Sequence, residues 1–94
     1  MSMNKLTLKI RFTLKNINEV PNQAGVYILW RGVNRKPYIG SAGAGRLRSR
    51  LLEHLRQRDR RGITNFQYKL TGSTEESRRW EKYYRDKLNP EQRI

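Results

Sequence analysis

The chain has 94 residues, enough for one domain spanning residues 1–94, and its net charge is +13, from 21 Lys and Arg against 8 Asp and Glu. Such an imbalance favours a polyanionic partner, most often nucleic acid. The absence of cysteine excludes disulfides and thiolate zinc sites. No apolar run approaches the ~20 residues of a membrane helix, so we expect a soluble, intracellular, cytoplasmic protein with no membrane partner.

The first predicted element is a strand over residues 5–15, KLTLKIRFTLK. Its apolar positions alternate with polar ones without interruption: Leu6, Leu8, Ile10, Phe12 and Leu14. Period-two alternation is typical of a strand that is buried on one face, so the other face would be basic. A long edge strand of this kind can also pair with a second copy, which leaves both a monomer and a homodimer open.

A connection, two strands and a turn are predicted next. Residues 16–25, NINEVPNQAG, are expected to form a connection, because proline and glycine interrupt any regular pattern. The run GVYILW at 25–30 predicts a short, buried strand. RGVNRK at 31–36 then predicts a hairpin turn, and PYIG at 37–40 the returning strand.

From Arg46 the apolar period becomes that of a helix. Three leucines recur at i, i+4 and i+8: Leu47, Leu51 and Leu55. The helix is expected to end within the arginine-rich segment that precedes Gly62. Residues 65–72, NFQYKLTG, predict a further strand.

The closing element is predicted to be a helix that runs to about Leu88. Ser73 or Thr74 would cap its N-terminus, with Glu76 as the partner in a capping box. Pro90 would end it. The element order β-β-β-α-β-α indicates an α+β fold, with a small antiparallel sheet flanked by helices.

Few side chains stand out as chemically active, and each has an ordinary interpretation. Arg50 and His54 share one face of the first helix and border its leucine stripe, which places them near the sheet. Glu81 borders the apolar stripe of the closing helix, where a carboxylate is costly unless it is paired or bound to a metal. Tyr27 and Tyr38 lie in apolar strands, where a tyrosine is usually a core residue.

The remaining basic residues around the first helix point in several directions, and we assign them to attraction of a nucleic-acid backbone: Arg46, Arg48, Arg56, Arg58, Arg60 and Arg61. The glycine-rich segment GSAGAG at 40–45 lacks the Lys-Ser/Thr ending of a P-loop and the context of a dinucleotide fingerprint. Nucleotide binding is therefore not expected.

Four short motifs, in order, resemble the GIY-YIG nuclease family. GVY at 25–27 is followed eleven residues later by YIG at 38–40, then by RLLEH at 50–54, and finally by a glutamate, Glu81, nine residues before a proline. The resemblance spans about residues 21–90. It implies a three-stranded antiparallel sheet flanked by helices, to which the strand at 5–15 would be an N-terminal addition.

The resemblance also implies roles for individual residues. Tyr27 and Tyr38 would lie beside the scissile phosphate, and one of them would deprotonate or orient the attacking water. Arg50 would hold the phosphate, and His54 would support it or relay a proton. Glu81 would be the single protein ligand of one Mg²⁺ or Mn²⁺ ion, which would keep several waters.

Some positions depart from the family pattern or support it only indirectly. Gly25 and Gly40 belong to the two half-motifs. Ser41 stands where the excision-repair members have a lysine, although the homing-type members share GSA. The glycine-rich turn is about two residues longer than in the excision-repair members, so Arg46 and Arg48 compete for the role of Arg50. The frame L-x-x-R-L-x-x-H favours Arg50.

The sequence thus predicts a metal-dependent DNA endonuclease. The alternatives are a non-catalytic, basic nucleic-acid-binding module on the same fold, and a structural component of a ribonucleoprotein in which the motifs are coincidental. With no second domain for target recognition, the enzyme would cut DNA with little sequence preference, prefer a branched structure, or take its specificity from a protein partner. Nicking and double-strand cutting both remain open.

Overall fold

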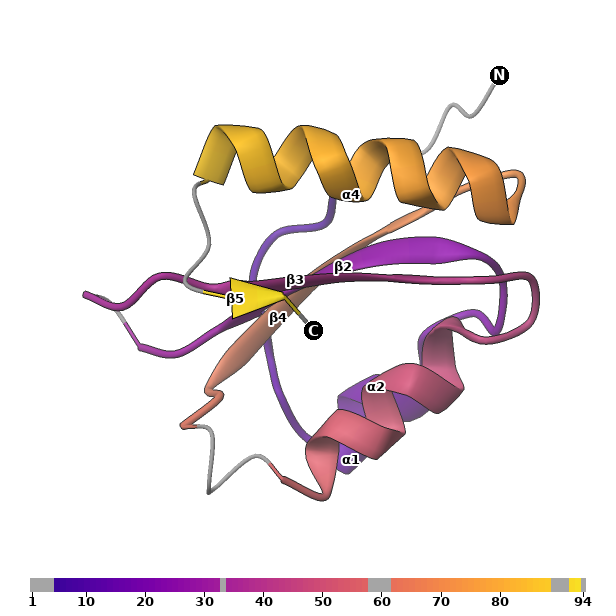
Figure 1. Ribbon diagram of the computed structural model, residues 1–94. Coiled ribbons are helices and arrows are strands. Elements are labelled where there is room, and N and C mark those ends of the chain that lie inside the picture. Colours follow the sequence, from indigo (N-terminus) through magenta and orange to yellow (C-terminus); the bar gives the residue numbers. More distant parts are fainter. Residues whose placement is uncertain (1–4, 33, 58–61, 89–91, 94) are drawn as a thin grey trace.

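The computed structural model describes residues 5–32, 34–57, 62–88 and 92–93. It has a five-stranded sheet in the order β1-β4-β2-β3-β5. In chain order the elements are β1 Ile10–Arg11, α1 Leu14–Asn18, β2 Gly25–Trp30, β3 Tyr38–Ala42, α2 Leu47–Leu55, β4 Asn65–Leu70, α4 Thr74–Leu88 and β5 Gln92–Arg93. Helix α4 covers one face of the sheet and α1 and α2 the other (Figure 1), which is the α+β arrangement that the sequence predicts.

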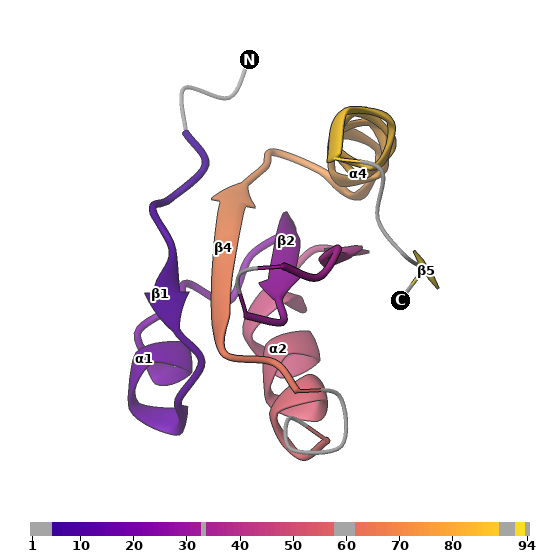
Figure 2. The ribbon, with the colours of Figure 1, turned by 90° about the vertical axis from the view of Figure 1, so that its left-hand side faces the viewer.

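The centre of the sheet consists of the three antiparallel strands β4, β2 and β3. In the register of this sheet, Tyr27 lies opposite Gly40 on one side and opposite Tyr68 on the other. Alternate residues of β2 therefore face α4 or the α1–α2 layer. Figure 2 shows β1, β4 and β2 side by side, with α1 and α2 on one side of them and α4 towards the other.

The two faces of the sheet bury separate hydrophobic clusters. On the α1–α2 side the largest fully buried side chains include Tyr27, Phe66, Leu47 and Leu51. On the α4 side three aliphatic residues are buried, and aromatic residues of α4 pack against them: Val26, Ile28 and Ile39 with Trp80 and Tyr84. The leucine stripe predicted from Leu47 onward lies on α2, and the apolar stripe predicted for the closing helix lies on α4. Both stripes face the sheet.

The N-terminus of α4 is capped as the sequence predicts. The Glu76 backbone N–H donates to Ser73 Oγ at 3.1 Å, and Glu76 Oε1 in turn accepts from the Gly72 backbone N–H at 2.8 Å. The first bond satisfies a donor that the first turn would otherwise leave unpaired, and the second ties the residue before the N-cap to the helix. The predicted helix terminator Pro90 lies outside the described residues.

The predicted strand over residues 5–15 is wrong over most of its length. Regular pairing covers only Ile10 and Arg11, although the Thr7 backbone N–H still donates to the Tyr68 carbonyl at 3.0 Å. Side chains then replace the ladder, because Thr7 Oγ1 accepts from the Tyr68 N–H and Gln67 Nε2 donates to the Thr7 carbonyl. Leu8 is consequently 87% exposed instead of buried.

The end of the predicted strand is the start of a helix that the sequence analysis missed. Thr13 has extended backbone angles and its Oγ1 accepts from the Asn16 N–H, which makes it the N-cap of α1. The helix buries Ile17 and leaves Leu14 largely exposed. The connection predicted for residues 16–25 therefore begins with a helical turn.

The other boundaries agree with the sequence more closely. β2 spans the predicted residues, and β3 begins one residue later than predicted and extends to Ala42. α2 ends at Leu55, and Gly62 adopts a positive φ of 71°, as its predicted role in a turn requires. β5, which pairs in parallel with β3, was not predicted. In the part of the chain that the structure describes, no helix has the length and apolar character needed to cross a bilayer.

Candidate active site

A buried tyrosine–histidine pair lies between the sheet and α2. Tyr27 from the middle of β2 is fully buried, and its hydroxyl lies 2.9 Å from His54 Nε2. Which atom donates depends on the histidine tautomer. The i, i+4 spacing predicts that Arg50 and His54 share a face, and it is the histidine that reaches the core while Arg50 stays at its margin, with a side chain 33% exposed.

The environment of Tyr27 raises the pKa of its hydroxyl above the ordinary value of 10.0. Burial is the largest cause, because the phenolate would lose its hydration. The nearby Arg50 guanidinium opposes this effect, whereas the negative charges of Glu81 and Glu53 add to it. Tyr27 is therefore protonated at neutral pH.

The glycines of the two half-motifs have steric reasons to be glycine. A Cβ at Gly40 would lie 2.5 Å from the Tyr27 hydroxyl oxygen, so the tyrosine ring rests directly on the backbone of β3. A Cβ at Gly25 would lie 2.8 Å from both Leu47 Cδ2 and the Lys69 carbonyl oxygen. These contacts are needed for packing whatever the chemistry of the site.

Tyr38 is held by a residue that the sequence analysis did not single out. The Arg31 guanidinium is buried, donates from Nη1 to the Tyr38 hydroxyl at 3.2 Å, and lies 4.5 Å from the centre of the Tyr38 ring. Two further bonds from Arg31 reach the Lys36 carbonyl oxygen. The two tyrosines thus have different partners, a histidine for one and an arginine for the other.

On the α4 side of the sheet, Glu81 forms a second polar group with Ser41 and Arg85. Its Oε1 accepts from Ser41 Oγ at 2.6 Å, and its Oε2 from Arg85 Nη1 at 3.3 Å. Its side chain is only 16% exposed. The sequence analysis expected a seam carboxylate to be paired or metal-bound, and in the structure it is paired.

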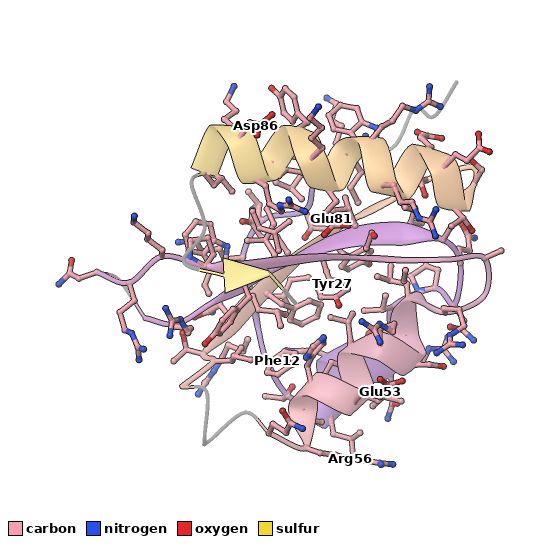
Figure 3. All side chains as sticks on the ribbon, viewed as in Figure 1. Phe12, Tyr27, Glu53, Arg56, Glu81 and Asp86 are labelled. Carbon is pink, nitrogen blue, oxygen red and sulfur yellow. The ribbon has the colours of Figure 1, made fainter. Side chains whose placement is uncertain are left out.

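The two polar groups lie on opposite sides of β3. Tyr27 faces α2 across Gly40, whereas Ser41, the next residue, presents its hydroxyl to Glu81 on α4. Figure 3 shows Glu81 between α4 and the sheet, and Tyr27 on the opposite side. Four of the five predicted catalytic residues therefore interact around β3: Tyr27 is hydrogen-bonded to His54, and its pKa responds to the charges of Arg50 and, from the other side of the strand, Glu81. Tyr38 lies nearer the hairpin turn.

Glu81 can serve as a ligand for a hydrated magnesium ion. Each carboxylate oxygen has two lone pairs, so the bonds from Ser41 and Arg85 leave acceptor capacity. No group of three or more His, Cys, Asp or Glu side chains gathers within the described ranges. Any cation held by Glu81 would therefore keep mostly water ligands, as magnesium commonly does.

The arginines assigned to backbone attraction differ in their surroundings. Arg46 and Arg56 are exposed, and Arg46 Nη2 lies 3.9 Å from Glu53 Oε2. Arg48 Nε donates to the Val20 carbonyl at 2.8 Å, so part of its role is structural. Three members of the set lie outside the described residues: Arg58, Arg60 and Arg61.

Sequence reasoning missed the two arginines that hold the predicted site residues. Arg85 follows Glu81 by four residues, and that spacing is a signal for an ion pair on a helix that was available in the sequence. Arg31 follows β2 in the hairpin turn, and no local pattern indicates that its guanidinium folds back onto Tyr38. Comparisons with known proteins found no matching family model, no similar curated protein and no similar solved structure.

Proposed function

We propose that the chain is a metal-dependent DNA endonuclease of the GIY-YIG type. The observation that carries the proposal is that Tyr27, with its partner His54, and Glu81 contact adjacent residues of β3, Gly40 and Ser41, from the two sides of that strand. Tyr27, His54 and Glu81 come from three separate motifs of the sequence. The fold also provides the three central antiparallel strands and the flanking helices that such an enzyme requires.

The roles are those that the resemblance implies, and the chemistry of each side chain supports them. Tyr27 is protonated at neutral pH and orients the attacking water. As the water attacks, Tyr27 passes its own proton to His54 through the hydrogen bond that joins the two side chains and takes up the proton that the water loses. Arg50, at the margin of this pair, holds the phosphate and stabilises its developing negative charge.

Glu81 would hold one Mg²⁺ or Mn²⁺ ion, which would supply Lewis-acid stabilisation of the leaving oxygen. Ser41 fixes the orientation of that carboxylate through its 2.6 Å hydrogen bond. The net charge of +13 attracts the DNA backbone without selecting a sequence.

The test is plasmid nicking in Mg²⁺ and in Mn²⁺, with EDTA as the blank. Glu81→Gln keeps the shape of the side chain but removes its charge, so we expect at least about a hundredfold loss of nicking with DNA binding retained. Glu75→Gln is the matched control, because Glu75 is an exposed acid of the same helix, and it should cut normally. Undiminished nicking by Glu81→Gln would refute the role of Glu81.

A second candidate is the non-catalytic nucleic-acid-binding module. It is favoured by the saturation of the site, since Tyr27 is fully buried and both carboxylate oxygens of Glu81 are already hydrogen-bonded. This second function predicts salt-sensitive DNA binding with no nicking in the presence of Mg²⁺ or Mn²⁺. The same assay therefore separates the two functions.

A further inference from the structure

Arg85 has the position of a competitor for the charge of Glu81. Its Nη1 lies 3.3 Å from Glu81 Oε2, one helical turn along α4, and the two side chains are only 25% and 16% exposed. Opposite charges attract more strongly where water is partly excluded than on an open surface. In the protein without DNA, then, the negative charge of Glu81 is already balanced by a cation.

This arrangement disfavours a divalent cation at Glu81. The incoming ion would be repelled by the guanidinium and would have to share or displace it at Oε2. Ser41 Oγ occupies the other oxygen, so no carboxylate oxygen is without a donor. A weak metal site would result unless Arg85 could transfer to another anion.

A DNA phosphate is an anion of the right kind for Arg85. A guanidinium presents paired N–H donors that match two phosphate oxygens, and such charge-assisted pairs are among the stronger hydrogen bonds in proteins. The hydrogen bond to Glu81, 3.3 Å long, uses only one guanidinium nitrogen, Nη1. A phosphate at the α4 side of β3 therefore offers Arg85 a better partner than it has.

We propose that Arg85 exchanges Glu81 for a backbone phosphate of bound DNA, and that this exchange frees Glu81 for the divalent cation. The inference rests on the proposed nuclease function and assigns Arg85 to DNA binding, a role the sequence motifs do not give it. By linkage, DNA raises the affinity for the cation and the cation raises the affinity for DNA by the same factor. The metal site is thus completed only when substrate is present.

The experiment measures Mn²⁺ binding by electron paramagnetic resonance, with and without a short phosphorothioate duplex that resists cutting. We expect the duplex to tighten Mn²⁺ binding to the unmodified protein about tenfold, within the usual range of coupling between two sites. Binding by the duplex alone is subtracted. Arg85→Gln should bind Mn²⁺ more tightly than the unmodified protein without DNA, and its gain on adding DNA should fall below about threefold.

Two further variants make the result specific. Arg78→Gln removes the same charge from an exposed position of α4 and should behave as the unmodified protein. Arg85→Lys keeps the charge but not the paired donors, so its Mn²⁺ affinity without DNA should stay low. Thermal melting of every variant checks that α4 remains folded.

The outcomes distinguish the inference from the function on which it rests. Full DNA coupling in Arg85→Gln, with Mn²⁺ binding still lost in Glu81→Gln, would overturn the exchange and leave the metal site standing. Mn²⁺ binding that is the same in Glu81→Gln as in the unmodified protein would refute the metal site itself, and the exchange with it.

Discussion

The two sides of β3 solve the problem of a buried polar group in different ways. On the α2 side, Tyr27 and His54 form a hydrogen-bonded pair that is almost completely buried. On the α4 side, Glu81 stays partly exposed and is held by a hydroxyl and a guanidinium. Desolvation therefore dominates the first side, as the raised pKa of Tyr27 indicates, whereas charge pairing dominates the second.

The contrast bears on which side can change its protonation or its partners. A buried, hydrogen-bonded pair favours a fixed geometry, because losing one partner leaves the other unsatisfied. A partly exposed ion pair can change its partner more readily than a buried hydrogen-bonded pair, provided that another anion takes its cation, since water and other ions reach it. We infer that the α2 side holds Tyr27 and His54 in a fixed geometry, whereas the α4 side can change the partner of Glu81.

The largest effect that would sharpen this comparison is expected from Tyr27→Phe. Loss of the hydroxyl that orients water and contacts His54 should reduce nicking by about 10²–10⁴-fold, the usual contribution of a positioned acid or base. Tyr38→Phe is the matched control for removing a strand hydroxyl, because that hydroxyl is bound to Arg31. Equal losses in both variants would contradict the special role of Tyr27, because cutting would then depend as much on the tyrosine whose hydroxyl is bound to Arg31. The measurement is a single-turnover cleavage rate.

Gly40→Ala should have the next largest effect, because it inserts a methyl group on the Tyr27 side of β3. The new Cβ would lie 2.5 Å from the Tyr27 hydroxyl, so either the ring or β3 must move. We expect a loss of about 1–3 kcal/mol in the free energy of unfolding, as overpacked cores show. Gly43→Ala is the milder control, since its Cβ would meet only the side chain of Thr74, with Oγ1 nearest at 3.1 Å. Urea denaturation of both variants makes the comparison, and equal stabilities would contradict it.

The smallest effect concerns alkaline pH. Because the folded-state pKa of Tyr27 is raised above 10.0, its stabilising contribution is fully present below pH 10 and is lost as the pH rises through the folded-state value. Above pH 10 the unmodified protein should lose stability relative to Tyr27→Phe, by at most about 1.4 kcal/mol per pH unit. Unfolding free energies between pH 8 and 11 would test this. A difference that does not change with pH would mean that Tyr27 titrates alike in both states.

Periodicity and capping predicted most of the fold. The run GVYILW could only be a buried strand, and the serine–glutamate cap of α4 lies where the sequence places it. The prediction was wrong at residues 5–15. Their apolar and polar residues alternate without interruption, but only Ile10 and Arg11 pair regularly with β4. Thr7 uses its own hydroxyl and the amide of Gln67 in place of a regular ladder, and no local pattern signals a bond between residues sixty apart.

The sequence was enough to name the residues of the candidate site, but not to say which of them contact one another. Helical spacing brought Arg50 and His54 to one face, yet only the tertiary fold decides that His54 meets Tyr27. Arg85 is a local partner of Glu81 and could have been found from the i, i+4 spacing. Arg31 could not, because its bond to Tyr38 depends on the path of the hairpin turn.

The bare backbone at Gly40 has a consequence for how protons and cations are coupled. The Tyr27 hydroxyl lies against Gly40 on one face of β3, and the carboxylate of Glu81 is bound to Ser41 on the other. Burial is the largest cause of the raised pKa of that hydroxyl, Arg50 opposes it, and the charge of Glu81 is a further cause that raises it. Any cation that neutralises the carboxylate on one face therefore makes it easier for the phenol on the other face to release its proton. The charge on one face of β3 therefore influences proton release on the other.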